Sequence, residues 1–448
     1  MAAVKKSGKL PINLLTGWPN PRLLPVQQLS HAATNALGNP DLAQDLLGYG
    51  PDLGFPPLRQ SISKWLTQFY KPAEPISADR IAISGGASQN LARILQTYTD
   101  PIFTRACFLV APVYFLACRI FGDSGFDGRM KAVPEDEEGV DLEALRRGLE
   151  KSERKASEEG NTKPEIKKPK PWRKTFKYVI YAVPTFSNPS GKTMSMSRRE
   201  GLVRLAREFD ALIITDDVYD MLTWPATPEN APVIIEHTPH PRIVDVDRYL
   251  DNGPTSTFGN AISNGSFSKI VSPGCRTGWA EGMPSMVQGI SQSGTTKSGG
   301  APSQLTATFI NNMLETHVLQ NRIQDDLRPV YARRYYKLMD AIDTHLAPLG
   351  VRTHQAEDGV AGGYFVWLNL PANLACDADH LCRRALEEEA VSVISGSKFT
   401  VDGDETVGKE AFNHNIRLCF AWEDEDLLQE GVARLARVVK GELTGVHS

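Results

Sequence analysis

Residues 266–279 read SFSKIVSPGCRTGW and carry the most specific pattern in the chain. Ser266, Ser268, Lys269 and Arg276 fall within eleven residues. Two hydroxyls and a guanidinium together suit a doubly charged anion. A lysine beside such an anion, and partly shielded from water, is suited to Schiff-base chemistry. The stretch therefore predicts an anion site with a reactive lysine, and a simple surface lysine is the alternative.

The composition is that of an ordinary folded protein. The chain has 448 residues, which suggests two or three domains, and 49 Lys and Arg against 53 Asp and Glu give a net charge of −4. That balance offers nucleic acid no basic field. No apolar run approaches the ~18 residues of a membrane span, and the basic N-terminus lacks the apolar core of a secretory signal. We therefore expect a cytoplasmic protein that binds neither nucleic acid nor a membrane.

The cysteines and histidines indicate no metal site. The six cysteines include no C-x-x-C pair, which favours reduced side chains in the core. The nine histidines contain no H-E-x-x-H, and His237 and His240 stand in HTPHP, which is typical of a turn. We therefore expect no metal.

Short apolar runs alternate with helical patterns over the first half of the chain, which predicts buried parallel strands in an α/β fold. The expected strands are 81–84, 106–111, 178–183 and 211–215, and the expected helices are 57–70, 88–98 and 198–209. Beyond about residue 301, long helical stretches precede GGYFVWLNL and NIRLCFA, and an amphipathic pattern covers 424–441. This change indicates a second, smaller α+β domain.

These patterns divide the chain. We predict a large domain at 56–315 and a small domain at 316–448. Residues 1–55 are rich in Pro and Gly and are expected to form an irregular arm that joins the small domain. Residues 150–174 are dense in charge and spaced by prolines, which predicts a solvated surface insertion. A basic docking patch at 163–174 is the alternative for that insertion.

Two glycine-containing stretches resemble nucleotide loops only weakly. SNPSGKT (187–193) ends like a P-loop, but Phe186 stands where that motif needs glycine, and Pro189 removes a backbone N–H. GYGPDLG (48–54) follows no strand and lacks the G-x-G-x-x-G spacing. Neither stretch indicates a nucleotide site.

The pattern S-x-S-K-x-x-x-P-G-x-R-x-G at 266–278 resembles the cofactor-lysine signature of the class I/II aminotransferases, which are pyridoxal 5′-phosphate enzymes of fold type I. Matches run from Leu14 to Phe420, nearly the whole chain. The resemblance implies a large domain with a mostly parallel sheet flanked by helices, and a homodimer with active sites at the subunit interface. GGYFVW with the arm GWPNP is most similar to the 2-aminoadipate and aromatic aminotransferase subgroup.

The resemblance assigns the residues around the cofactor ring. Lys269 would hold the cofactor as a Schiff base. Asp216 in IITDDVYDML would pair with the pyridine nitrogen, in preference to Asp217 beside it. Tyr219 and Asn188, the latter in PTFSNPSG, would reach the phenolic oxygen. Lys269, Asp216 and Tyr219 are the expected catalytic residues.

The cofactor phosphate is expected at ISGGASQNL (83–91), where a strand leads into a helix. Relatives often carry serine where Ala87 stands, so backbone N–H groups are expected to make most of this contact. Tyr114 in APVYFLA would stack on the ring, and Tyr49 would reach the partner subunit's phosphate. The expected phosphate residues of the same subunit are Gly86, Ala87, Ser88, Ser266, Ser268 and Arg276.

Two of the three expected substrate residues, Gly17 and Arg417, lie outside the central block. Arg417 in NIRLCF would grip the α-carboxylate, which an arginine can bind through two hydrogen bonds. Gly17 and Asn188 would lie beside it. In the arm, Trp18 would cover an apolar side chain and Arg22 would pair with a distal carboxylate; packing of the arm and a solvated charge are the respective alternatives.

The implied activity is ping-pong transamination between an amino acid and a 2-oxo acid. A lyase or cyclase that uses the same cofactor residues is the first alternative. A non-catalytic regulatory module is a remote one, because the arm motif begins by Leu14 and we expect no DNA-binding domain before it.

Overall fold

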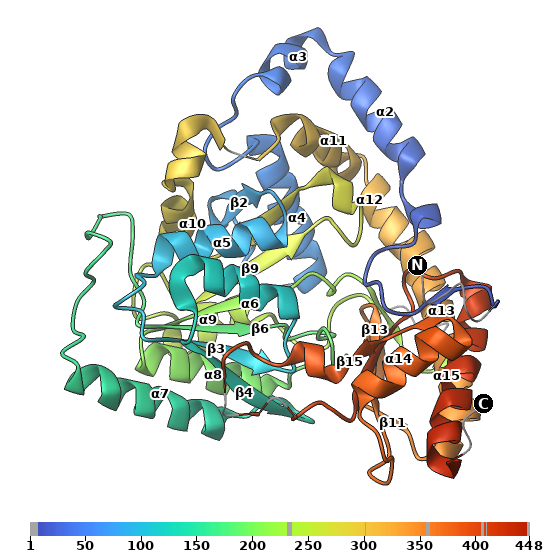
Figure 1. The fold of residues 1–448 in the computed structure, drawn as a ribbon. Coiled ribbons are helices and arrows are strands. Elements are labelled where there is room, and N and C mark those ends of the chain that lie inside the picture. The colour runs from blue at the N-terminus through green and yellow to red at the C-terminus, as the bar shows by residue number, and fades with distance from the viewer. Residues whose placement is uncertain are drawn as a thin grey trace.

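An eight-stranded, mostly parallel sheet forms the centre of the computed structural model (Figure 1). The structure describes residues 8–230, 235–300, 302–354, 359–404, 407–408 and 410–445. Across the sheet the strands run β2 (Ile81–Ser84), β10 (Gly278–Glu281), β9 (Ala261–Ser266), β7 (Ala211–Asp216), β6 (Tyr178–Ala182), β3 (Ala106–Ala111), β4 (Met130–Asp136) and β5 (Gly139–Val140). β10 and β5 run antiparallel to their neighbours.

Helices cover both faces of this sheet, as the continuous apolar strands predict. Every residue of β3 and β6 is buried. One face packs on α5 (Ala87–Tyr98), α6 (Phe115–Phe121) and α10 (Pro284–Ser291). The other packs on α7 (Leu142–Glu158), α8 (Met196–Glu208) and α9 (Ile243–Tyr249). The predicted α/β fold class is confirmed.

A second, antiparallel sheet lies at the C-terminal side of the molecule (Figure 1). Its strands run β11 (Arg352–Thr353), β13 (Phe365–Asn369), β16 (Asn415–Cys419) and β15 (Ile394–Ser395). Around it lie α13 (Arg328–Ala341), α14 (Ala378–Glu389) and α15 (Leu428–Thr444). β12 (Val360–Gly362) pairs with β8 (Thr223–Pro225) in a separate two-stranded sheet, which ties this region to the segment that follows β7. The proposed division near residue 315 falls between α11 (Gln304–Glu315) and α12 (Val318–Asn321).

The N-terminal arm corrects the expectation of an irregular segment. β1 (Ile12–Asn13) pairs in parallel with β14 (Val391–Ser392), which places the arm beside the second sheet. Two helices follow, α2 (Val26–Leu37) and α3 (Pro40–Leu47), and α2 packs on α11. Two of the prolines that suggested irregularity, Pro25 and Pro40, stand at the starts of these helices, where a missing N–H costs nothing, and Gly38 and Gly48 end the two helices. The chain then enters α4 (Pro56–Tyr70).

The charged insertion is partly ordered by the fold. Its first residues belong to α7, and the rest crosses the surface as an extended loop (Figure 1). Asp100 accepts hydrogen bonds from the backbone N–H groups of Ile166 and Lys167, at 2.9 and 2.7 Å. Lys167 also donates to the carbonyl of Gln96, and burial lowers the pKa of its amine to about 8. The segment is therefore anchored at its middle.

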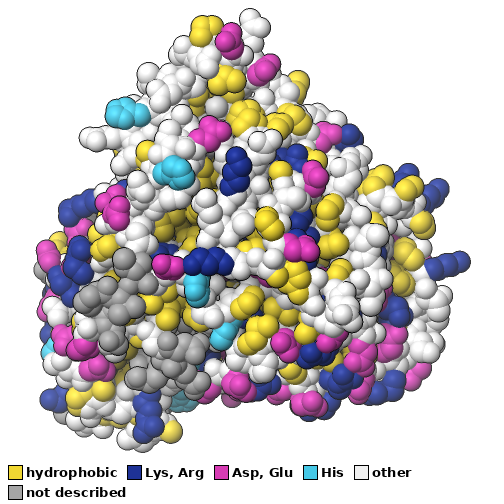
Figure 2. All heavy atoms as spheres, turned by 180° about the vertical axis from the view of Figure 1, so that it is seen from behind, with side chains coloured by type: hydrophobic (Ala, Val, Ile, Leu, Met, Phe, Trp, Pro, Cys, Tyr) yellow, Lys and Arg dark blue, Asp and Glu magenta, His cyan; other side chains and the backbone are white. Residues whose placement is uncertain are grey.

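The surface carries charges of both signs. Figure 2 shows Lys and Arg interspersed with Asp and Glu over one face, and hydrophobic side chains on the apex that α2 and α3 form. Within the described residues, no helix combines the length and the apolar character that a membrane span requires. All six cysteines are free thiols.

Candidate active site

A cavity of about 380 Å³ lies at the carboxyl ends of the central strands. β7 ends at Asp216, β9 ends at Ser266, and β2 leads into α5 at the same edge of the sheet. In open α/β sheets this edge is where ligands bind. The arm and the second sheet close the cavity from the other side, through residues 15–18 and through Phe365, Ile394 and Arg417.

Lys269 lies in this cavity, just after β9. Its Nζ donates to the carbonyl oxygen of Gly17 at 2.8 Å. The hydroxyl of Tyr364 donates to the Lys269 carbonyl at 3.1 Å and so fixes the lysine backbone. Burial lowers the pKa of the Lys269 amine to about 8. A larger fraction of the amine is therefore neutral and nucleophilic near neutral pH than for an exposed lysine.

Asp216 faces the cavity, and two hydrogen bonds fix its carboxylate. Oδ2 accepts from the hydroxyl of Tyr181 at 2.6 Å, and Oδ1 accepts from Nδ2 of Asn264 at 2.6 Å. Burial raises the pKa of Asp216 to about 6, against the lowering effect of these two donors. A buried carboxylate held in this way is suited to a cationic partner such as a protonated ring nitrogen. Asp217 is engaged elsewhere, because it accepts from Thr215 and Ser263 inside the sheet.

The start of α5 and the residues after β9 form a cradle for an anion. Gly86 precedes the helix with φ +98°, and a Cβ there would lie 2.6 Å from Nη2 of Arg276. Arg276 donates to Ser268 Oγ at 3.4 Å and to the Gly85 carbonyl at 3.0 Å. Ser266 donates to Ser268 at 2.9 Å. A helix N-terminus, two hydroxyls and a guanidinium fit a phosphate group.

Within the described residues, Arg276 has no carboxylate at ion-pair distance, although arginines elsewhere in the fold are widely paired. Ala87 and Ser88 line the cavity beside it. No side chain caps the start of α5, so its first backbone N–H groups remain available to an anion.

Arg417 lies on β16 in the second sheet, lines the same cavity as Arg276, and is buried. Its Nη1 donates to Asn188 Oδ1 at 2.8 Å and its Nη2 to the Leu15 carbonyl at 2.7 Å, while Nε has no partner within the described chain. The guanidinium carbon stacks 4.1 Å from the ring centre of Phe365. A buried guanidinium with neutral partners alone leaves an attraction for an incoming carboxylate.

The remaining ring contacts come from Tyr114 and Tyr219, which both line the cavity. Tyr114 stands directly before α6. Tyr219 packs against Tyr364 at 5.6 Å between ring centres, and Lys269 Nζ lies 5.9 Å from its ring centre. Burial raises the pKa of the Tyr219 hydroxyl above its ordinary value, so this group is held as a neutral donor.

Of three residues that the sequence predicts in the site from the arm, one lines the cavity and two do not. Trp18 lines the cavity and meets Trp422 edge-on, with 5.6 Å between ring centres. Arg22 does not line it: its side chain is 80% exposed, and its Nη2 lies 3.2 Å from Oδ2 of Asp424. Tyr49 is 90% exposed and also lies outside the cavity of its own chain.

Sequence reasoning missed the residues that hold Asp216. Asn264 donates to Asp216 and, at 3.0 Å, to the carbonyl of Ala87, and its own Oδ1 accepts from Asn90 at 2.9 Å. Tyr181 reaches Asp216 from the neighbouring strand. The one available signal was an asparagine inside the buried strand AISNGS, where a polar side chain needs a partner.

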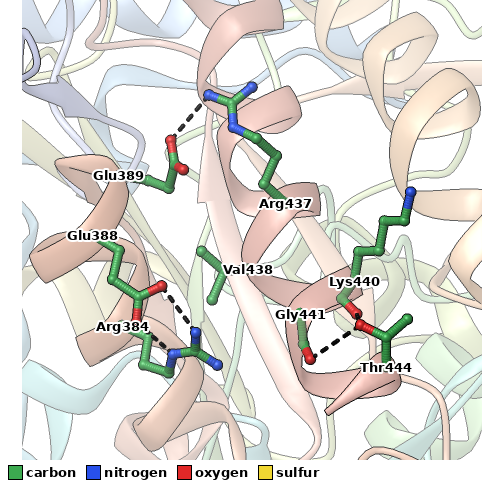
Figure 3. A pocket seen from close by; sticks show the side chains of 8 residues that line it. All are labelled: Arg384, Glu388, Glu389, Arg437, Val438, Lys440, Gly441 and Thr444. Atoms are coloured by element: carbon green, nitrogen blue, oxygen red, sulfur yellow. Dashed lines mark hydrogen bonds and ion pairs between the residues drawn. The ribbon is translucent and has the colours of Figure 1, made fainter. Parts of the chain in front are cut away.

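A second cavity, of about 450 Å³, opens between α14 and α15 (Figure 3). Its arginines are already paired, Arg384 with Glu388 and Arg437 with Glu389. Behind it, the ligand atoms of Cys376, His380 and Glu442 come within 4.8 Å of one another. Glu442 binds Arg384 there, and both ring nitrogens of His380 have partners, so a metal would have to displace these contacts.

Comparisons with known proteins identify the family of the chain. The family model of aminotransferase class I and II matches residues 20–435. An uncharacterized protein of Saccharomyces cerevisiae is 34% identical over 96% of this chain and 97% of its own. The 2-aminoadipate transaminase of Thermus thermophilus is 28% identical over 95% of this chain and 89% of its own.

A solved structure shares the fold. The α-aminoadipate aminotransferase of Thermus thermophilus, in complex with N-(5′-phosphopyridoxyl)-L-leucine, superposes with a TM-score of 0.73 and is 25% identical, over 100% of this chain and 98% of its own. The chain therefore belongs to the aminotransferase class I and II family, the pyridoxal 5′-phosphate-dependent transferases that its lysine signature resembles.

Proposed function

We propose that this protein transfers an amino group from an amino acid to a 2-oxo acid by a ping-pong mechanism, with pyridoxal 5′-phosphate as cofactor. The observation that carries the proposal is that Lys269, Asp216, Arg276 and Arg417 all line one cavity. A primary amine, an anion for a pyridinium and two guanidiniums for a phosphate and a carboxylate are the groups this chemistry needs.

The residues divide the work by position. Arg276, Ser266, Ser268 and the start of α5 hold the phosphate. Asp216 holds a proton at the pyridine nitrogen, and the cofactor so held supplies an electron sink for the bond at the substrate Cα. The phosphate site also includes Gly86, Ala87 and Ser88, at the start of α5.

Lys269 moves the proton at the substrate Cα, because its amine is the buried base in the cavity. Tyr114 covers the ring, while Tyr219 and Asn188 donate to the phenolic oxygen. Asn188 already accepts from Arg417 through Oδ1, which leaves its Nδ2 to donate. Arg417 binds the substrate α-carboxylate beside Gly17 and so orients Cα toward Lys269.

The quaternary structure belongs to the same proposal. Tyr49 lies outside the cavity of its own chain, and Leu47, the last residue of α3, is 71% exposed. Together, α2 and α3 form the projecting apex of the molecule (Figure 1). Exposed apolar side chains on a projecting element favour burial against another subunit. In a homodimer, Tyr49 would contact the phosphate of the partner subunit.

Lysine substitution and product analysis test the function. The purified protein is expected to bind the cofactor with a visible absorption band, and borohydride reduction with peptide mass spectrometry is expected to find the cofactor on Lys269. Lys269→Ala should lose the band, whereas Lys71→Ala, an exposed lysine paired with Glu236, should keep it. Attachment to another lysine would overturn the assignment. Ammonia release without an amino-acid product would replace the transferase with a lyase.

A further inference from the structure

The charged side chains of the first cavity are all accounted for by the proposed function. Among the described residues that line it, these are Asp216, Lys269, Arg276 and Arg417. They face the ring nitrogen, the Cα proton, the phosphate and the α-carboxylate. None of them is left to bind a charged group on the side chain of a substrate.

Apart from the polar residues that the proposed function assigns to the cofactor and the α-carboxylate, the large side chains of the wall are apolar. They come from the arm, from the start of α6 and from the second sheet: Leu15, Trp18, Phe115, Leu116, Phe365 and Ile394. Thr16 is the polar exception, and its hydroxyl already accepts a hydrogen bond from Asn13 at 2.9 Å. A substrate side chain that enters here meets mainly carbon, and the Thr16 hydroxyl is a neutral group that supplies no opposite charge for a carboxylate.

Part of this apolar wall is exposed to water, and a bound ligand would cover it. Leu15, Trp18 and Leu116 are 36%, 61% and 40% exposed, although they gather around one cavity. The rings of Trp18 and Trp422 meet at 86° and are therefore not stacked face to face. Large apolar side chains exposed around one concave site mark the binding of an apolar group.

A carboxylate on the substrate side chain would bind poorly against this apolar wall. Arg22 stands four residues after Trp18 in the arm. It forms an exposed ion pair with Asp424 and does not line the cavity. Placing a carboxylate against Leu15 and Leu116 would remove its water without supplying a cation, and that is costly.

We propose that this cavity selects amino acids with a large apolar side chain, aromatic or branched aliphatic, and discriminates against those with a second carboxylate. The inference rests on the proposed function. It assigns Trp18 and Leu116 as specificity-determining residues, since they come from different elements, the arm and α6, and are the most exposed of the large apolar residues that line the cavity.

The first test compares donors in a single half-reaction, so that no acceptor influences the result. The holoenzyme is mixed with phenylalanine, leucine, glutamate or 2-aminoadipate, and the loss of the cofactor absorption band and the release of 2-oxo acid are followed. The apolar donors should exceed the dicarboxylic donors in kcat/KM on the order of 100-fold or more. Calorimetry should show 3-phenylpropanoate binding more tightly than glutarate, without any turnover.

Variants locate the selectivity. Trp18→Ala should lower kcat/KM for phenylalanine about tenfold or more while changing that for alanine less than about twofold, because alanine does not reach the tryptophan. Leu116→Arg should raise kcat/KM for glutamate, and since Leu116 is partly exposed this variant is expected to fold. Arg22→Ala and Ile166→Ala, the latter an exposed apolar residue in the charged insertion, are the matched controls and should change no donor.

The outcomes separate the two proposals. No reaction with any donor would overturn the proposed function itself. Reaction that favours glutamate or 2-aminoadipate, tighter binding of glutarate, or a loss of glutamate activity in Arg22→Ala would overturn the apolar selectivity and leave the transferase standing.

Discussion

At the scale of the residue, burial controls the reactivity of Lys269. Its pKa is lowered to about 8, so the amine is protonated and unreactive well below that pH and neutral above it. At pH 7 about a tenth of it is neutral. The rate at which cofactor-free protein captures pyridoxal 5′-phosphate should therefore rise about tenfold from pH 6 to pH 7 and level off above about pH 9. Stopped-flow absorbance measures this rate, and a rate that still rises steeply at pH 10 would contradict it.

Asn264 is the second residue whose position has a measurable consequence. It donates both amide hydrogens, to Asp216 and to the Ala87 carbonyl, and Asn90 fixes its orientation. Asn264→Ala removes a hydrogen bond to a charged group, worth about 1.5–3 kcal/mol, so the donor half-reaction should slow on the order of tenfold to a hundredfold. Cofactor retention should remain, because Arg276 and the serines are unchanged.

The matched control is Asn90→Ala, which leaves the hydrogen bond from Asn264 to Asp216 in place. It should slow the donor half-reaction less than Asn264→Ala does. The pH at which the bound cofactor changes its absorption should also shift in Asn264→Ala, since the carboxylate beside the ring nitrogen is less firmly held. A slower reaction with no such shift would indicate a general structural effect instead.

At the scale of the element, the start of α5 depends on one glycine. Gly86 has φ +98°, which side chains rarely adopt, and an added Cβ would lie 2.6 Å from Arg276. Gly86→Ala should therefore displace Arg276 and raise the dissociation constant of the cofactor at least about tenfold. Gly85→Ala is the matched control, because a Cβ there would lie 3.4 Å from its nearest neighbour, on the flexible side chain of Gln89. Equilibrium dialysis measures both; equal affinities would contradict the role of Gly86.

The elements also show what a single sequence can predict. The apolar runs at 106–111 and 211–215 predicted β3 and β7 almost residue by residue, because a strand buried on both faces needs continuous apolar side chains. α2 and α3 escaped prediction, since each is short and its stabilisation comes from packing at a distance, on α11. The pairing of β1 with β14 joins residues nearly 400 positions apart, and no local pattern encodes it.

The site divides in the same way. Lys269, Asp216, Arg276 and Arg417 stand in motifs whose spacing is visible in the sequence, and the fold brings them to one cavity. Their supporting partners do not stand in motifs. Asn264 matters because β9 lies beside β7, a neighbourhood that exists only once the sheet is formed.

At the scale of the whole molecule, the position of Tyr49 requires a second subunit if it is to contact a phosphate. The residue lies beside Gly299, where an added Cβ would lie 2.7 Å from its ring, and it does not line the cavity of its own chain. Light scattering should therefore find a dimer. Leu47→Glu places a charge on the exposed apolar apex and should weaken that dimer and, with it, the retention of cofactor.

Mixing two defective proteins tests the crossing of Tyr49 directly. Lys269→Ala lacks the reactive amine, and Tyr49→Ala should retain cofactor poorly, so each alone should be weak at limiting cofactor. In a mixed dimer, the subunit that keeps Lys269 faces the intact Tyr49 of the other, which restores one complete site. Random exchange at equal amounts makes half of the dimers mixed, so about a quarter of the wild-type activity should return. If Tyr49 instead served its own subunit, no mixed dimer would contain a complete site, and the mixture would stay as inactive as its components.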